Sequence, residues 1–291
     1  MKSLRSLSDV LVCAFLIVVT VGIGTTVFRS GPKDLRASTT RNLGKVGQAC
    51  NLYAVDHGGR YPMSMSANTA TNSWRIGGRA PAGWSGPPHS LEPRLTEDGS
   101  FWANSLLPYG VSQTGYQIAG AQSLSSLVVP FPLARPMSVG ISMNGLAHTF
   151  SQSEVSSPGF FPTFWTSNGR RNTVGIATSN PTLNCITTLQ PCLYVATRPP
   201  QSGTSGAAIM WFPNGCPQST TVSHRVHGLD GLYVTQDGSV RPWPMGLVSA
   251  PDSTDPSLDP WTSYRPGGVC AQSIWVGPNG YPWLFRPNYA P

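Results

Sequence analysis

The sequence predicts an α+β fold: a long N-terminal helix, transmembrane in its first part and amphipathic in its second, packed on a β-rich antiparallel head with many loops. One observation is an uncharged apolar stretch at residues 10–28, close to the roughly 20 residues that cross a bilayer. A proline-free amphipathic segment follows at residues 34–56. With 31 Gly, 28 Pro and only 11% charged residues, the chain favours short strands and turns over a helical bundle. We therefore expect residues 1–57 to form the helix and residues 58–291 an extracytoplasmic head.

The apolar stretch follows Lys2 and Arg5, which resemble the positively charged start of an export signal. Three interpretations stay open. A cleaved signal peptide accounts for the small residues at Gly22-Ile23-Gly24, and an uncleaved anchor accounts for the length. A helix that assembles with copies of itself accounts for both the length and Asp9, which precedes the run. No later segment is long and apolar enough to span a membrane, so each interpretation places the head outside the cytoplasm.

The second part of the predicted helix carries Leu43, Val46, Cys50 and Tyr53 at spacings of three and four residues. These positions form one apolar stripe of a helix. Asp34 near its start complements the helix dipole, and the Gly pair after His57 provides a stop. The segment is either a membrane-proximal helix packed on the head, or the upper half of a longer helix whose apolar lower half packs against copies of itself.

The head is expected to consist of short antiparallel strands, with one short helix at residues 101–108. Its clearest local structure is a hairpin in which Gln236-Asp237-Gly238 forms a turn of the Asp-Gly type between two strands. Gly238 supplies the positive φ that such a turn requires. The predicted strands are residues 125–130, 138–142, 173–177, 207–212, 231–235 and 239–243.

Six cysteines divide unevenly along the chain. Cys13 lies in the apolar stretch and Cys50 in the amphipathic segment, whereas the other four belong to the head. In an exported chain, four cysteines are most simply two disulfides, and the short spacing of one pair suggests a locally closed loop. Four reduced buried thiols are the alternative, and no Cys-x-x-Cys pattern favours zinc. The predicted pairs are Cys185 with Cys192 and Cys216 with Cys270.

The formal net charge of +7 comes from scattered Lys and Arg, which does not favour a nucleic-acid partner. A group of basic residues does follow the apolar stretch. Its position beside a membrane makes phospholipid head groups of the inner membrane the expected partner. The group consists of Arg29, Lys33, Arg36, Arg41 and Lys45.

Few residues suggest chemistry. His224 and His227 lie near Asp230 and Asp237, but His residues spaced by three on a strand or turn do not point the same way. We therefore predict no metal site and expect His227 to hydrogen-bond within the hairpin. There is no Gly-x-Ser-x-Gly elbow and no Gly-rich phosphate loop, so no enzyme is predicted.

Four stretches carry a family resemblance. They are Ser6-Leu7-Ser8-Asp9-Val10-Leu11-Val12; the segment from Asn42-Leu43 through Tyr53 to Gly59-Arg60-Tyr61-Pro62; Ser142-Met143-Asn144-Gly145; and His227 separated by nine residues from Asp237-Gly238. Together they resemble bacterial type IV pilin-like proteins, in particular the pseudopilin-like branch with a prepilin-type N-terminus and a C-terminal His-x9-Asp-Gly motif. Leu4 and Arg5 stand where that family has its Gly-Phe cleavage site.

The resemblance implies a structural or assembly subunit of a type IV pilus-like or type II secretion pseudopilus-like filament. The head would lie in the periplasm or outside the cell, and the partners would be the inner membrane, copies of the chain, other pilin-like subunits and a prepilin peptidase. Assembly would depend on Asp9, Leu11, Phe15 and Val18, and the head hairpin on His227, Asp237 and Gly238. Related pseudopilins carry a structural calcium ion, for which Asp252, Asp255 and Asp259 are the candidate ligands here, but their spacing matches no recognised calcium loop and solvated turn residues explain it as well, so no cofactor is predicted.

Two other classes of function remain open. The same apolar stretch could anchor or export a binding module that recognises carbohydrate through surface tryptophans, since nine Trp are spread through the head. An exported hydrolase of unrecognised type is the other alternative. Self-assembly distinguishes the filament subunit from both.

Overall fold

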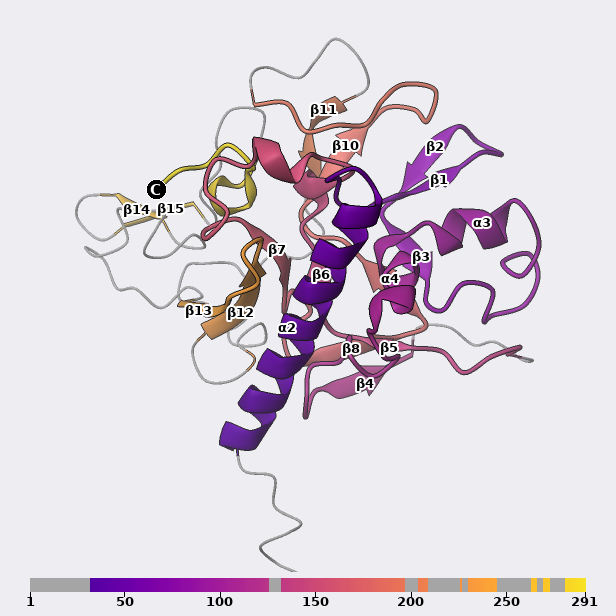
Figure 1. Ribbon diagram of the computed structural model, residues 1–291, viewed down its shortest axis with the longest axis horizontal. Helices are drawn as coiled ribbons and strands as arrows, with labels where there is room; N and C mark the ends of the chain where they lie inside the picture. The colour runs from indigo at the N-terminus through magenta and orange to yellow at the C-terminus, as the bar shows by residue number, and fades with distance from the viewer. Residues whose placement is uncertain are drawn as a thin grey trace, which may run out of the picture.

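The computed structural model describes residues 32–125, 132–196, 204–208, 226, 230–244, 263–265, 269–272 and 281–291 (Figure 1). The described part combines helices with a β-rich region. Its α-helices are α2 (Pro32–Asp56), α3 (Arg94–Gly99) and α4 (Trp102–Ser105). Its 3-10 turns are η1 (Leu107–Tyr109), η2 (Gly145–Ala147), η3 (Gln152–Glu154) and η6 (Trp283–Phe285).

The amphipathic helix predicted at residues 34–56 is confirmed as α2. Proline at its first position suits the start of a helix, because the missing N–H has no intrahelical partner there. Its predicted stripe is buried, with Leu43, Val46 and Cys50 at most 1% exposed. The helix ends where the Gly59 amide donates to the Ala54 carbonyl at 2.7 Å, beyond Gly58 at a φ of +64°.

The predicted fold class is wrong about a long, partly apolar N-terminal helix. Among the described residues the long helix is α2, and no helix there is long and apolar enough to cross a membrane. The physical reason lies at the junction: Pro32 has no N–H to bond to the preceding turn, and its ring clashes with that turn, so a helix is favoured to begin there. The apolar stretch at residues 10–28 lies outside the described residues.

The central sheet has four antiparallel strands in the order β13-β12-β7-β6. Its members are β6 (Ser142–Met143), β7 (Pro162–Trp165), β12 (Asp230–Thr235) and β13 (Val240–Pro244). The hairpin predicted in this region is confirmed as β12–β13. Helix α2 packs against β12, β7 and β13 (Figure 1).

Smaller sheets surround this centre. The prediction of antiparallel pairing needs one correction: β4 (Gln122–Leu124) pairs with β8 (Arg171–Val174) in parallel, and β5 (Ser138–Val139) completes that sheet. The two-stranded pairs are β1 (Ser66–Asn68) with β2 (Ser73–Arg75), β3 (Gly77–Arg79) with β9 (Ile176–Thr178), β10 (Thr182–Cys185) with β11 (Thr204–Ala208), and β14 (Ser263–Arg265) with β15 (Val269–Gln272).

Both faces of the central sheet are buried. Phe164 and Val234 belong to the cluster that contains the α2 stripe, whereas their neighbours Trp165 and Tyr233 belong to a second cluster on the other face. Alternation along a strand produces this division. Trp165 and Tyr233 are cross-strand partners whose rings stack with centroids 5.6 Å apart.

The approach of α2 to the sheet depends on Gly47. A Cβ at this position would lie 2.5 Å from Cγ2 of Val234, closer than real side chains approach one another. Glycine therefore lets the helix backbone sit directly on β12. Helix α2 and the β12–β13 hairpin are thus joined in one packed unit.

Candidate functional site

Many of the residues predicted to form sites or disulfides lie outside the part of the chain that the structure describes. Cys270 is in β15, where its side chain is not described. The remaining residues in this class are Asp9, Leu11, Phe15, Val18, Cys216, His224, His227, Asp252, Asp255 and Asp259.

Asp237 and Gly238 form the turn between β12 and β13. Oδ1 of Asp237 accepts hydrogen bonds from the Thr235 hydroxyl at 2.6 Å and from the Ser239 amide at 3.0 Å. Burial opposes ionisation, but these hydrogen bonds outweigh it and lower the pKa of Asp237. Gly238 has a φ of +84°. The carboxylate is thus engaged by its own turn, which gives it a structural role.

The Ser142-Met143-Asn144-Gly145 stretch is also engaged with the protein's own backbone. The Asn144 side chain donates to the carbonyls of Pro162 and Phe285, each at 2.9 Å, and accepts from the Leu146 amide at 3.0 Å. One buried amide therefore links β7, the C-terminal segment and the start of η2. A Cβ on Gly145 would lie 2.2 Å from the Pro181 carbonyl oxygen, so this position has no room for a side chain.

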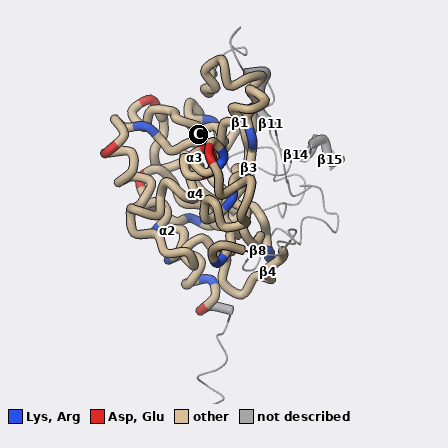
Figure 2. The backbone as a smooth tube through the Cα atoms, turned by 90° about the vertical axis from the view of Figure 1, so that its right-hand side faces the viewer, with Lys and Arg blue, Asp and Glu red and all other residues tan. Residues whose placement is uncertain are grey.

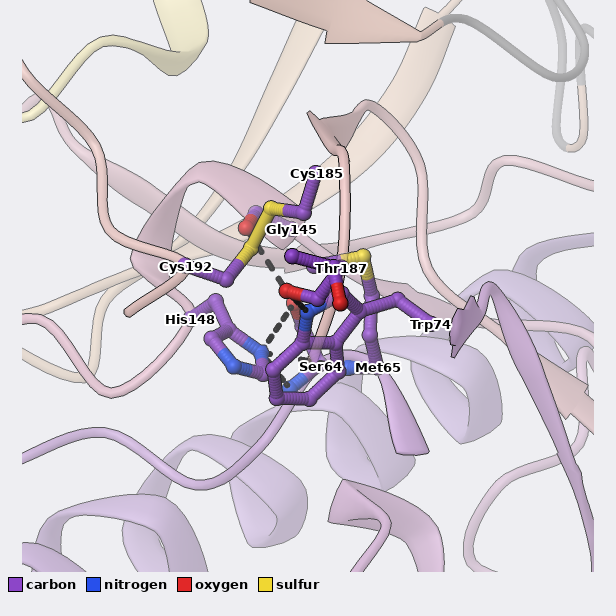
Figure 3. Close-up of a disulfide and its surroundings, with 8 residues drawn as sticks. All are labelled: Ser64, Met65, Trp74, Gly145, His148, Cys185, Thr187 and Cys192. Carbon is purple, nitrogen blue, oxygen red and sulfur yellow. Dashed lines mark hydrogen bonds between the residues drawn. A yellow bond between two sulfur atoms is a disulfide. The ribbon is translucent and has the colours of Figure 1, made fainter. Parts of the chain in front are cut away.

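The predicted disulfide between Cys185 and Cys192 is confirmed (Figure 3). The loop that it closes is held against the β1–β2 hairpin. Nε1 of Trp74 donates to the Thr187 carbonyl at 3.0 Å, and the Thr188 amide donates to the Asn72 carbonyl at 3.0 Å. The disulfide and these contacts fix a loop that exposes aliphatic residues to solvent.

His148 lies beneath this loop, beside Trp74 and Ser64 (Figure 3). Its Nδ1 accepts hydrogen bonds from the Ser64 amide at 3.1 Å and the Met65 amide at 3.3 Å, and burial lowers its pKa to about 4. The Ser64 hydroxyl lies 3.2 Å from the same nitrogen and donates to the Gly145 carbonyl at 3.1 Å. Both side chains are buried, so this Ser–His contact serves packing rather than nucleophilic attack.

A pocket of about 210 Å³ between β3 and α3 is lined by a cluster of cationic side chains. Three arginines and a histidine line it, together with Gly77, Gly78 and Ile176. In Figure 2 acidic and basic positions lie together near α3 and β3. The four cationic or titratable residues are Arg75, Arg79, His89 and Arg94.

Two carboxylates behind the pocket hold its arginines in place. Arg75 donates to Glu97 and to Asp98, each at 3.0 Å, and Arg94 donates to Glu97 at 3.0 Å. Burial opposes ionisation of Glu97, but hydrogen bonds from Thr69 and Arg94 outweigh it and lower the pKa of Glu97. These carboxylates are nearly inaccessible, so they position the arginines and are closed to a ligand.

His89 connects the second arginine to this network. Nη2 of Arg79 lies 3.1 Å from Nε2 of His89, and Nδ1 of His89 lies 3.2 Å from Oδ2 of Asp98. Burial and the neighbouring Arg79 charge lower the pKa of His89. The neutral tautomer with its proton on Nδ1 satisfies both contacts, because it accepts from Arg79 and donates to Asp98.

The sequence did not predict this pocket, although one signal was present. In a chain that is only 11% charged, residues 75–98 contain three Arg, three acidic residues and a His. A second pocket of about 390 Å³ is larger, but its one charged lining residue, Arg135, is exposed and the rest are polar or apolar. The smaller pocket is therefore the stronger candidate for specific binding.

Across the described ranges, no group of three or more His, Cys, Asp or Glu side chains is placed to hold a metal ion. No family model, curated protein or solved structure matches the chain.

Proposed function

We propose that this chain is a non-enzymatic structural or assembly subunit of a type IV pilus-like or type II secretion pseudopilus-like filament at the bacterial cell envelope. In this proposal the apolar stretch at residues 10–28 inserts into the inner membrane and later packs against other subunits, while the head is displayed outside the cytoplasm. Asp9 would set the register between subunits, and Leu11, Phe15 and Val18 would supply apolar contacts.

The observation that supports the proposal most directly is the division of α2 into two faces. One face packs on the central sheet through Leu43, Val46 and Gly47. The opposite face is exposed along the helix and ends in Leu52, 54% exposed, and Val55, 79% exposed. A helix with a buried stripe and a second, partly apolar exposed stripe is suited to contact both its own head and a neighbouring subunit.

The chemistry of the exposed face also suits a contact between subunits. Arg41 and Lys45 are exposed on it and lie nearer the N-terminal end of α2 than the aliphatic pair does, where they would contact anionic lipid head groups. The aliphatic pair occupies the last turns. Membrane attraction and subunit contact would therefore use different parts of one helix face.

Site-specific photocrosslinking in the full-length protein tests this proposal. A benzoylphenylalanine placed at Val55 should crosslink to a second copy or to another pilin-like subunit in bacteria that display filaments. The matched control is Ile186, 69% exposed on the disulfide loop that packs against the β1–β2 hairpin, where no such product is expected. Asp9→Ala should abolish the filaments. A full-length protein that stays monomeric, with filaments unaffected by Asp9→Ala, would remove the basis of the proposal.

A carbohydrate-binding module has no comparable support in the described residues. Trp84, Trp102, Trp165 and Trp243 are buried, and Trp74 and Trp283 are partly buried. A stacking platform for sugars needs an exposed aromatic face. We therefore propose the assembly subunit alone.

A further inference from the structure

We propose that the pocket lined by Arg75, Arg79, His89 and Arg94 binds a single carboxylate group of a small-molecule ligand. This inference is independent of filament assembly. The first argument is the balance of charge. The three guanidinium groups that line the pocket stand beside two carboxylates, those of Glu97 and Asp98, and His89 is neutral. One positive charge is therefore left without a counter-charge. A monoanion would neutralise it.

Unused hydrogen-bond donors point to the same ligand. The Nε atoms of Arg75 and Arg79 are buried, and neither has a hydrogen-bond partner among the described residues. Like the two carboxylates, these nitrogen atoms are closed to a ligand; what they add beside the pocket is positive charge that no acceptor neutralises. Arg94 uses Nη1 for Glu97, which leaves its other nitrogen atoms available to a ligand. A carboxylate offers two acceptor oxygens to such planar donors.

The arginines are held in place before any ligand arrives. Arg75 contacts both carboxylates, and Glu97 is fixed in turn by the amide and the hydroxyl of Thr69, each at 2.7 Å. Guanidinium groups that are already ordered lose less conformational freedom on binding. The pocket is therefore preorganised for binding, unlike a group of flexible cations on the surface.

The walls limit the size of the ligand. Gly77 and Gly78 contribute only backbone to one wall, and Ile176 covers another. A volume of about 210 Å³ is below the range of roughly 300–1,000 Å³ typical of drug-sized ligands. It suits one carboxylate with a short substituent. The lining residues come from β2, β3, β9, α3 and the loop before α3, so binding would join segments that are distant in sequence.

His89 is a built-in reporter of binding. It contacts Arg79 on one side and Asp98 on the other, and Arg94 also acts on it electrostatically. A bound anion near Arg79 would offset the arginine charge that disfavours the imidazolium. The pKa of His89 should therefore rise when the pocket is occupied.

The test titrates the full-length protein with sodium acetate at constant ionic strength and follows the five histidine ring signals by NMR. The His89 signal, assigned from its loss in His89→Gln, should shift saturably, and its pKa should rise. Arg79→Gln should weaken acetate binding by at least about tenfold, the size expected for losing a charge-assisted hydrogen bond. Arg94→Gln, at a partly exposed side chain, provides a milder second variant if Arg79→Gln does not fold.

Arg60→Gln is the matched control. Arg60 is an exposed arginine whose Nη1 contacts the Thr149 carbonyl at 3.0 Å, away from the pocket, and its loss should leave acetate binding unchanged. Shifts that stay linear in acetate, or that are equal in all variants, would overturn the proposal. Tighter saturable binding of sulfate or inorganic phosphate than of acetate at the same site would overturn the assignment to a carboxylate.

Discussion

Lowering the pH from 7 to 5 is expected to destabilise the protein through His148. The imidazole is 2% exposed, and Nδ1 accepts hydrogen bonds from the Ser64 and Met65 amides. Protonation would place a hydrogen on the atom that accepts those bonds, in a site buried from solvent. Burial accordingly lowers the pKa of His148 from 6.5 to about 4.

The sign and the size follow from proton linkage. Between pH 6.5 and about 4 the unfolded chain binds a proton at this histidine that the folded chain does not bind, so the free energy of unfolding falls as the pH falls through this window. The slope approaches about 1.4 kcal/mol per pH unit, and the loss from pH 7 to 5 is about 2 kcal/mol. That is a large part of the roughly 5–15 kcal/mol that stabilises a domain.

Urea denaturation of the full-length protein at pH 7 and pH 5, followed by tryptophan fluorescence, measures this loss. His148→Asn is the informative variant, because its Oδ1 can accept from the same two amides and does not titrate. The wild type should lose about 2 kcal/mol more than this variant between the two pH values. The lowered pKa of His89 changes the free energy of unfolding equally in both proteins. The lowered pKa of Glu97 affects stability mainly below pH 4.5, the ordinary pKa of a Glu side chain, which is outside the range measured. Equal losses in both proteins would refute the linkage to His148.

Three further perturbations test the packing. Gly47→Ala should lower the free energy of unfolding by about 1–3 kcal/mol through overpacking against β12. Gly44→Ala is the control in the same urea assay: its Cβ would lie 3.8 Å from Cγ2 of Val240, so it should be neutral or stabilising by up to about 1 kcal/mol. Asn144→Ala should cost about 2–4 kcal/mol and lower the melting temperature, because three buried backbone groups lose their partner. Reduction of the Cys185–Cys192 disulfide should cost about 2–3 kcal/mol, and a melting temperature unaffected by dithiothreitol would contradict this.

The parts of the fold that the sequence predicted correctly are those encoded by local patterns. The stripe of Leu43, Val46 and Cys50 repeats at helical spacing and is buried as expected. The Asp237-Gly238 turn follows from the positive φ that glycine allows. The long N-terminal helix was inferred from hydropathy, which records how apolar a segment is but not whether its backbone continues through Gly31-Pro32.

The candidate pocket depends on long-range geometry, and for that reason it was not predicted. Arg75 meets Glu97 and Asp98, and Arg79 meets His89, only because the Pro- and Gly-rich chain between them turns back on itself. The parallel pairing of β4 with β8 is likewise set by the path of the chain and has no local signal. Charge density over residues 75–98 could have pointed to the region, but the pattern does not say which charges would be buried.

Asp237 and Asn144 differ from the residues of the candidate pocket in how many of their hydrogen-bonding atoms already have partners within the protein. Oδ1 of Asp237 is occupied by its own turn and Oδ2 lies 3.9 Å from Arg241, while the Asn144 amide is occupied by three backbone groups. Arg94 at the pocket, in contrast, uses Nη1 for Glu97 and keeps its other nitrogen atoms for a ligand, as far as the described part of the chain shows. Substitution at Asp237 or Asn144 should therefore change stability, whereas Arg94→Gln should weaken anion binding with a smaller effect on the urea midpoint, because Arg75 and Thr69 still contact Glu97. A variant of Asp237 that lost acetate binding while keeping wild-type stability would contradict this separation.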